Sequence, residues 1–560
     1  MINIKNKILI FFSVFSVPLY CQEALKSTQE DYYDFLSLNA VVKRPYLNYR
    51  TLSDSVWKAP ESAEDGTAIS RHVWNGINLG ELRALSKNVS LRVYGPELFA
   101  SFNTNSPYGQ NDGALWQGRG FNSSLSAGAH LRAFGIEAVF KPQVSFSQNL
   151  AFDYLKPGAF VDAVYKDKAA VYGYYGGYQT DVPQRFGDDP FFTFDWGDSE
   201  IRYTWKTLTI GFGTQTPWLG SAYLNPIIHS NNAPSYPKLD LGLRRQPVVL
   251  PFLDWYLGDV EARMWLGRLS ESDYYDDRPS NDYFMLHAFS LAYAPAFIPG
   301  FVLSVNRISI SPWKLENLKY IKPTGQDSNT GIDDQKGSAA ISWVFQKVGL
   351  EIYGELGIDD FVFGKLTGYI RYPFHTMVYT AGLKKTVDIS PKKSLYGELI
   401  LELNNMEASQ NFQFWWPYSF YSHSYELSYA QKGQILGAGS GGGGNSQLLM
   451  FKVFYPKGTA SVFVHRVNPD NNFVYAQAVN QNANGELTKK YAGGFRADLT
   501  FGISALYFLR NNISLGGGFS YTYIINPYYF YADITREPFK ILGDIEKNNF
   551  SFNFVFKFNL

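Results

Sequence analysis

Six tryptophan residues lie within polar stretches of this sequence, close to amides and hydroxyls. Such stretches offer flat aromatic faces, on which the CH groups of a sugar ring can stack, beside polar groups that bond to sugar hydroxyls. The alternative for any single tryptophan is packing within a loop or at a lipid interface. The residues concerned are Trp116, Trp218, Trp255, Trp313, Trp415 and Trp416.

Signals for catalysis or for metal binding are weak. The 7 histidines form no i, i+3 or i, i+4 pair of the kind that binds zinc. The glycine-rich stretch 437–444 lacks the Gly-Lys-Ser/Thr of a phosphate loop and the glycine that a nucleophile elbow needs two residues before its serine. Acidic clusters at 188–189 and 273–277 are expected to be solvated loops. We therefore expect no enzyme, no metal and no cofactor.

The composition excludes several classes of protein. Of the 560 residues, 17% are aromatic and 1 is cysteine, while 50 basic residues balance 50 acidic ones. A disulfide-rich module needs paired cysteines, a nucleic-acid binder usually carries a basic excess, and a disordered chain is poor in aromatics. The mean hydropathy of −0.19 disfavours a helical membrane protein. A large folded chain rich in aromatic residues and glycine remains.

Residues 1–21 have the pattern of a secretory signal peptide. Lys5 and Lys7 precede an apolar stretch that Pro18 ends. We expect cleavage after Cys21, and lipidation of Cys21 is the alternative, although Tyr20 disfavours it. Residues 22–80 are predicted to form an N-terminal helical segment and linker, because apolar residues recur at helical spacing before Pro45.

From about residue 80 onward the hydrophobic period becomes two. In the last eleven residues, phenylalanines from Phe550 to Phe558 alternate with mostly small or polar residues such as Ser551 and Asn553. One face of this strand is aromatic and the other is polar, as in a strand between lipid and a wet lumen. The apolar alternation runs to Leu560, as in the recognition signal of bacterial outer-membrane barrels.

Strand pairs with tight turns alternate with long polar connections, which is the asymmetry of an outer-membrane barrel. We predict an all-β fold over residues 81–560, a transmembrane antiparallel barrel of about 18 strands. The predicted pairs include 124–133 with 136–147, 200–205 with 208–213, 283–294 with 300–310, 339–345 with 350–355, 447–454 with 460–466, and 495–509 with 513–524. The predicted long loops are 103–120, 178–197, 217–257, 270–282, 311–336, 404–423, 467–492 and 526–548.

Residues 211–245 resemble the motif region of the Wzi capsule-assembly family. That region has a Trp-Gly, an apolar stretch, Ser-Asn-Asn-Ala and a Pro-aromatic-Pro pattern. The corresponding residues here are Trp218, Gly220, Ser230, Asn231, Asn232, Ala233, Pro234, Tyr236 and Pro237. Segments 33–46, 258–268, 285–307 and 432–447 also resemble the family, so the similarity spans most of the mature chain.

The resemblance implies an outer-membrane barrel of 18 strands with a small helical periplasmic part. It also implies a lectin-like, non-catalytic role in binding capsular polysaccharide, exopolysaccharide or lipopolysaccharide glycan at the cell surface. Expected partners are outer-membrane lipid and, during biogenesis, the barrel-assembly machinery. We expect a monomer and no nucleic acid.

Glycan contact or a structural role is open for the candidate residues, and turn-forming Asn and Pro favour a structural role for the motif. The candidates are Trp218, Ser230, Asn231, Asn232, Tyr236, Trp255, Trp415 and Trp416. The competing functions are an outer-membrane channel for small or hydrophobic solutes and an outer-membrane hydrolase.

Overall fold

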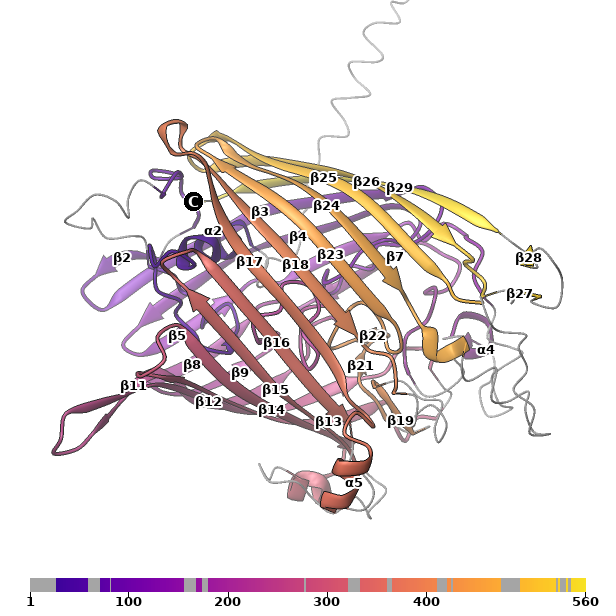
Figure 1. The fold of residues 1–560 in the computed structure, drawn as a ribbon, viewed down its shortest axis with the longest axis horizontal. Coiled ribbons are helices and arrows are strands. Elements are labelled where there is room, and N and C mark those ends of the chain that lie inside the picture. Colours follow the sequence, from indigo (N-terminus) through magenta and orange to yellow (C-terminus); the bar gives the residue numbers. More distant parts are fainter. Residues whose placement is uncertain are drawn as a thin grey trace, which may run out of the picture.

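The computed structural model is a closed antiparallel β-barrel (Figure 1). It describes residues 27–58, 71–80, 82–155, 168–173, 180–275, 278–320, 333–359, 365–409, 420–424, 427–474, 494–529, 532–533, 540–541 and 545–559. The predicted signal peptide, with Cys21, lies outside this part of the chain. Within the described residues, no helix has the length and apolar character needed to cross a membrane.

Eighteen strand positions close the wall in the described part of the chain, which confirms the predicted barrel. Two positions are each divided between two strands, β5 with β6 and β7 with β8. The wall strands are β3 (Val89–Asn103), β4 (Gly120–Ala133), β5 (Ile136–Phe140), β6 (Gln143–Ser147), β7 (Phe191–Asp195), β8 (Glu200–Trp205), β9 (Leu208–Gly213), β11 (Lys238–Leu250), β12 (Trp255–Ser270), β13 (Tyr283–Pro295), β14 (Phe301–Pro312), β15 (Asp334–Phe345), β16 (Leu350–Asp359), β17 (Val378–Ser390), β18 (Leu395–Asn405), β23 (Asn445–Tyr455), β24 (Gly458–Asn468), β25 (Ala497–Arg510), β26 (Ile513–Ile525) and β29 (Glu546–Phe558).

The remaining described elements are short and lie at the two ends of the barrel or inside it. Strand β2 extends a hairpin with β3, and the other short strands form two-stranded pairs. These elements are α2 (Thr28–Ser37), α4 (Lys168–Tyr172), α5 (Lys365–Arg371), η2 (Leu315–Tyr320), η4 (Pro391–Lys393), β1 (Tyr49–Arg50), β2 (Arg83–Ser86), β10 (Trp218–Leu219), β19 (Ser422–Ser424), β20 (Leu427–Ser428), β21 (Ala430–Gln431), β22 (Gln434–Ile435), β27 (Ala532–Asp533) and β28 (Lys540–Ile541).

The wall closes where β29 pairs with β3, with Ser551 opposite Asn103 and Lys557 opposite Glu97. We call this pairing the closing seam. Because closure leaves no edge strand, every wall strand has a hydrogen-bonded neighbour on each side, as a lipid environment requires. Short turns lie at one end of the wall and long connections at the other, so the short-turn end faces the periplasm in an outer-membrane barrel.

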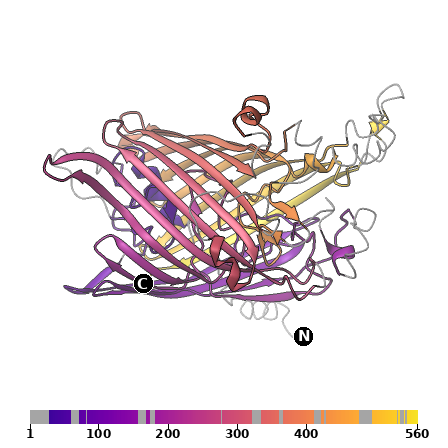
Figure 2. The same cartoon turned by 90° about the horizontal axis from the view of Figure 1, so that it is seen from below.

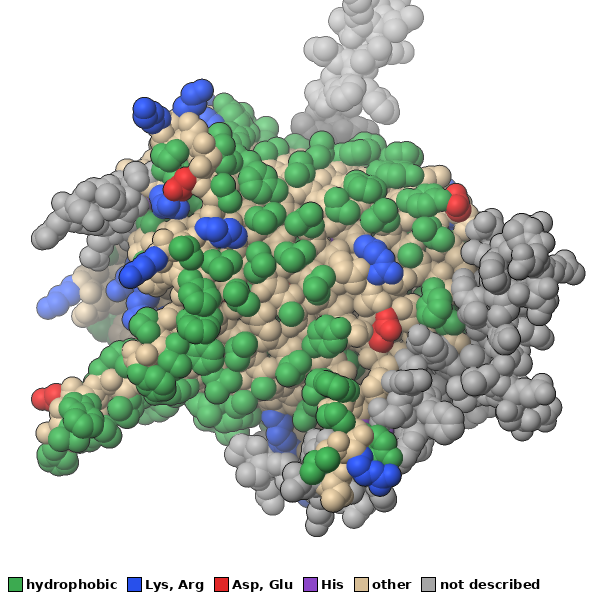
Figure 3. All heavy atoms as spheres, viewed as in Figure 1, with side chains coloured by type: hydrophobic (Ala, Val, Ile, Leu, Met, Phe, Trp, Pro, Cys, Tyr) green, Lys and Arg blue, Asp and Glu red, His purple; other side chains and the backbone are tan. Residues whose placement is uncertain are grey.

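The two faces of the wall differ as the alternation predicts. On β29, Phe550, Phe552 and Phe554 are exposed on the outside, whereas Asn549 and Ser551 are buried on the inside. Figure 3 shows hydrophobic side chains along the outer surface of the strands, with most Lys and Arg side chains nearer the short-turn end. An apolar belt of this kind fits a lipid bilayer.

Two wall strands lie entirely within stretches that were predicted to be loops. Strand β7 occupies residues 191–195 of the predicted loop 178–197. The stretch 217–257 was predicted to be a loop, but β11 occupies residues 238–250 and β12 begins at Trp255. Leu239 and Leu241 follow the two-residue period of a strand, and this period is broken at a register shift between Leu243 and Gln246. Arg244 and Arg245 lie in this bulge, which interrupts the two-residue alternation by which a strand is recognised in a sequence.

Candidate functional site

The N-terminal segment occupies the periplasmic end of the lumen (Figures 1 and 2). The Ser27 hydroxyl caps α2 by accepting a bond of 2.9 Å from the Glu30 amide. Beyond the cap, Tyr32 of α2 stacks on Trp74 of the same segment, with ring centroids 4.0 Å apart, and Phe35 stacks on Phe454 of wall strand β23 at 4.3 Å. The helix predicted in this part of the sequence therefore lies inside the lumen and packs against the wall.

Charged side chains of this segment pair with side chains of opposite charge on the wall. Asp34 accepts a bond of 2.7 Å from Lys384 on β17, and Arg44 makes a two-pronged contact at 2.8 and 2.7 Å with Glu351 on β16. Burial by itself raises the pKa of Asp34, but the charges of Arg44 and Lys384 lower it below its ordinary value. Ion pairs with the wall therefore help to hold the segment in place.

A wall carboxylate holds the backbone of the segment deeper in the lumen. Glu261 on β12 accepts bonds of 2.8, 3.0 and 2.7 Å from the amides of Leu47, Asn48 and Tyr49. The Asn48 amide group also donates to Ser290 at 2.7 Å. These bonds satisfy buried backbone groups that would otherwise be costly to place in the lumen.

The segment then meets a loop that enters from the opposite end of the barrel. This loop, residues 214–237 between β9 and β11, contains β10, and β10 pairs with β1 so that Tyr49 lies opposite Leu219. Arg50 reinforces the contact by donating to the Gly220 carbonyl at 2.8 Å. A piece of chain from the periplasmic side and a piece from the outer side are thus joined inside the lumen.

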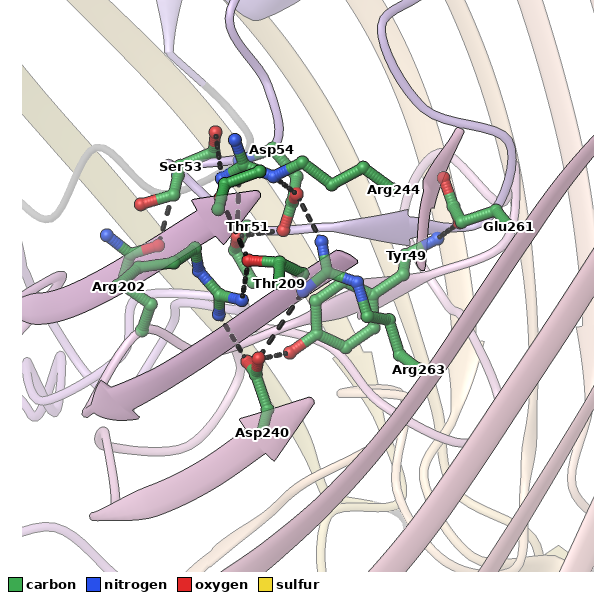
Figure 4. A network of polar contacts seen from close by, with 12 residues as sticks. Tyr49, Thr51, Ser53, Asp54, Arg202, Thr209, Asp240, Arg244, Glu261 and Arg263 are labelled. Carbon is green, nitrogen blue, oxygen red and sulfur yellow. Dashed lines mark hydrogen bonds and ion pairs between the residues drawn. The ribbon is translucent and has the colours of Figure 1, made fainter. Parts of the chain in front are cut away.

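Charged residues around this junction form one buried network (Figure 4). Asp54 pairs with Arg263 at 2.5 Å and with Arg244 at 3.0 Å. Asp240 on β11 accepts from Arg202 at 2.6 Å and from the Tyr49 hydroxyl at 3.0 Å. Although burial raises the pKa of Asp54, the guanidinium groups of Arg263 and Arg244 lower it below its ordinary value. The network therefore keeps its acids ionised beside fixed cations.

The 214–237 loop is itself held by wall carboxylates. Glu402 on β18 accepts bonds of 2.6, 3.0 and 2.8 Å from the amides of Tyr223, Leu224 and Asn225. Glu355 on β16 accepts from the amide of Ile227 at 2.9 Å. The sequence interpretation missed Glu261, Glu355 and Glu402. Their signal was a charged residue at an inward-facing position of a strand.

A second outer loop covers the first. From residues 420–440, the hydroxyls of Tyr421 and Tyr429 donate to the carbonyls of Ile227 and Ile228 at 2.7 and 2.6 Å. The glycine-rich stretch of this loop permits close backbone contact, since a Cβ on Gly437 would lie 2.1 Å from the Ile227 carbonyl oxygen. This agrees with a structural connection rather than a phosphate loop or a nucleophile elbow.

The motif residues lie in the interior of this assembly. The Ser230 hydroxyl donates to the Gly437 carbonyl at 2.6 Å, and the Asn232 amide group donates to Ile435 at 3.0 Å. Asn231 is buried, and its carbonyl accepts from Gly113 at 2.9 Å. Ser230 and Asn231 are buried and Asn232 is half-buried, so burial favours the structural alternative for Ser230 and Asn231.

The aromatic members of the motif are also buried. The Tyr236 hydroxyl lies 2.7 Å from His229 Nε2 and 3.3 Å from Trp265 Nε1. Burial lowers the pKa of His229 to about 3, so its ring is neutral. Trp218 donates to the Ala222 carbonyl at 3.2 Å and lies beneath the Arg50 guanidinium. These contacts fix the path of the loop.

The other candidates are not brought together with the motif. Trp255 is 63% exposed and lies beside the β11–β12 turn, at the end of the barrel that faces the periplasm. Trp415 and Trp416 lie outside the described residues. Among the described residues, no group of three His, Cys, Asp or Glu side chains is arranged to hold a metal ion.

Comparison with known proteins agrees with this architecture. Residues 100–311 match the family model described as capsule assembly protein Wzi. Over these residues the chain is similar to the Wzi capsule-assembly family. The resemblance stated from the 211–245 motif is thereby confirmed, and the barrel belongs to the outer-membrane type.

One of the solved structures that the chain resembles has a TM-score high enough to show the same fold. The chain is similar to Wzi of Escherichia coli, whose structure is described as an outer membrane protein involved in group 1 capsule assembly and as a carbohydrate-binding β-barrel. The TM-score is 0.56 at 12% identity, covering 97% of this chain and 100% of that one. OprB of Pseudomonas putida gives a TM-score of 0.34 at 11% identity, covering 85% and 94% of the two chains. OprD of Pseudomonas aeruginosa gives 0.37 at 9%, covering 86% and 96%. No curated relative matches the chain.

Proposed function

We propose that this Wzi-like barrel binds capsular or related exopolysaccharide at the cell surface and helps to hold it there. It acts as a lectin-like protein without catalysis. The observation that carries the proposal is the junction of β1 with β10, where pieces of chain from both ends of the barrel meet inside the lumen. A lumen occupied in this way leaves the outer loops as the surface that meets solutes outside the cell.

The same observation weighs against an outer-membrane channel as the main function. A barrel of this strand number is wide enough for an aqueous pore when its lumen is empty. Here the β1–β10 pair, the Glu261 contacts and the Glu402 contacts place chain inside the lumen beside β12 and β18. Single-channel recording in a planar bilayer distinguishes the two functions, because a large steady conductance would favour transport.

Further partners follow from the proposed location. Outer-membrane lipid contacts the apolar belt, and the barrel-assembly machinery inserts the chain. The glycan partner is capsular polysaccharide, exopolysaccharide or the glycan of lipopolysaccharide. Polysaccharides present many copies of one repeat, so contacts that are individually weak add through multivalency. We propose that the protein acts as a monomer.

The proposal is tested by deleting the gene and measuring cell-bound against shed polysaccharide. We expect a shift from the bound to the shed fraction, with total production unchanged, and restoration by the plasmid-borne gene. Unchanged retention in the deletion strain would contradict the proposal. Binding of the purified protein to polysaccharide isolated from the same cells provides the direct measurement.

A further inference from the structure

A polar pocket lies at the outer end of the closing seam, away from the motif residues. It encloses about 420 Å³, within the range of small-ligand sites. Its walls come from three parts of the chain: the two ends of the β3–β4 loop, the start of the β6–β7 loop and the first residues of β29. The lining includes Asn105, Arg119, Phe152, Asp153, Lys547 and Asn548.

The floor of the pocket is fixed by the barrel wall. Backbone and side-chain bonds join Thr104 to Phe550 across the seam, at 3.0 and 2.8 Å. The Asn105 amide donates to Asn549 at 2.8 Å, and the Asn105 side chain donates to the Asn548 carbonyl at 2.5 Å. A site built on such paired strand ends is preorganised, which lowers the entropic cost of binding.

Arg119 ties the two loops together and still offers a donor. Its Nε donates to the Thr104 carbonyl at 2.8 Å and its Nη1 donates to the Ala151 carbonyl. These bonds leave Nη2 for a hydroxyl or carbonyl of a ligand. The half-buried Phe152 ring lines the same pocket and offers an apolar face. An aromatic face beside several donors and acceptors suits a sugar ring.

The charges of the pocket balance. Lys547 pairs with Asp153 at 3.3 Å, and Arg119 and Glu546 add one further charge of each sign. A site for uronic acids would be expected to carry an excess of positive charge, since the carboxylates of the glycan must be met by cations. Balanced charges with exposed amides favour a ligand that bonds through hydroxyls.

We infer that this seam pocket is a subsite for an uncharged sugar unit of the surface polysaccharide. The inference rests on the proposed function and adds to it the place of contact and the class of sugar. The Phe152 ring stacks on the sugar, while Arg119, Asn105 and Asn548 bond to its hydroxyls. Weak single-unit binding here becomes firm attachment when neighbouring repeats engage neighbouring copies of the protein.

The test uses the full-length protein in lipid nanodiscs and three probes. These are the polysaccharide isolated from the same cells, neutral dextran oligosaccharides and oligogalacturonate of equal length. For Phe152→Ala we expect about tenfold weaker binding of the isolated polysaccharide and of the neutral probe. The matched control is Trp255→Ala, which removes an exposed aromatic ring from the periplasmic end and should leave binding unchanged.

A second variant tests the charge balance. Asp153→Asn leaves Lys547 and Arg119 in excess, so we expect the preference to move toward oligogalacturonate, with binding that weakens as salt is added. Asp254→Asn, at the exposed β11–β12 turn, is the control. Heat-modified migration on gels shows that each variant is folded.

The outcomes separate the two proposals. If the wild-type protein binds the isolated polysaccharide but Phe152→Ala binds it equally well, the pocket is not the contact site and the proposed function stands. If wild-type binding prefers oligogalacturonate and falls with salt, the assignment to an uncharged sugar is overturned. If the wild-type protein binds none of the probes, the proposed function itself fails.

Discussion

The Tyr49 amide donates to the Glu261 carboxylate across 2.7 Å, and this bond joins the N-terminal segment to wall strand β12. The amides of Leu47 and Asn48 share the same carboxylate. Replacing it by Glu261→Gln leaves one acceptor oxygen and turns an NH₂ group toward N–H donors. Hydrogen bonds to charged groups are worth about 1.5–3 kcal/mol each. We expect faster amide exchange at residues 47–49 by hydrogen–deuterium exchange, with barrel strands still protected.

Glu546→Gln is the matched control for that change, because Glu546 is exposed at the outer end of β29. It should leave exchange at residues 47–49 as in the wild type. Equal protection in Glu261→Gln and in the wild type would show that the carboxylate does not hold the segment.

The docked segment should loosen in acid. The pKa values of Asp34 and Asp54 are lowered from 3.8, so their contribution to stability is full above that value and is lost as the pH falls through the lower pKa of the folded state. Burial raises the pKa of Glu30 above 4.5, so its contribution has the opposite sign and partly offsets the loss. Limited proteolysis of the segment should therefore rise steeply only below about pH 4.

Asp54→Asn should remove part of this acid dependence. The change leaves Arg263 and Arg244 beside a neutral amide, which costs about 3 kcal/mol in a buried pair. We expect cleavage of the segment already at neutral pH and a flatter profile toward acid. A profile identical to that of the wild type would mean that other groups control the transition.

The two faces of β29 should respond differently to charge. Phe552 is 49% exposed on the lipid side, while Asn553 faces the lumen and is solvated. Phe552→Lys places a charge in the apolar belt and should destabilise the inserted barrel by about 2–4 kcal/mol. Asn553→Lys, one residue away, should be tolerated. Urea unfolding from lipid vesicles measures both, and equal effects would contradict the assigned orientation.

The motif should act through stability. Tyr236→Phe removes the hydroxyl that lies 2.7 Å from His229 Nε2, and a buried partner left unsatisfied costs about 1–3 kcal/mol. We expect a lower melting temperature and unchanged affinity for the isolated polysaccharide. Loss of affinity in a fully folded Tyr236→Phe protein would contradict this expectation and would indicate that the motif contacts the glycan directly.

The wall could be predicted where alternation is strong on both strands of a hairpin. Strands 200–205 and 208–213 were predicted with the bounds that the structure shows, and the turn residue Lys206 has a positive φ of 57°. The phenylalanines of β29 likewise face lipid as predicted. Strand β11 was missed because the bulge after Leu243 interrupts its two-residue period, so the sequence around it does not show the continuous alternation of a strand.

The lumen could not be predicted in the same way. Residues 220–237 are rich in Asn, Ser and Pro, which reads as a solvated outer loop, yet Ser230 and His229 are fully buried. Their burial depends on Glu355 and Glu402, which lie more than a hundred residues further along the chain and satisfy the loop backbone. Such long-range compensation leaves no periodic trace in the sequence. The seam pocket could not be predicted for the same reason, since the residues that line it are separated by over four hundred positions in the sequence.

The pairing of β3 with β29 also sets an order of assembly. These are the first and the last strands of the wall, so the ring cannot close before the strands between them are in place. The N-terminal segment precedes the whole wall in the chain, but it bonds to β12, β16 and β17. The segment therefore cannot complete its contacts before β17 has formed, and until then the rings of Tyr32, Tyr33 and Phe35 lack the wall side chains against which they are buried.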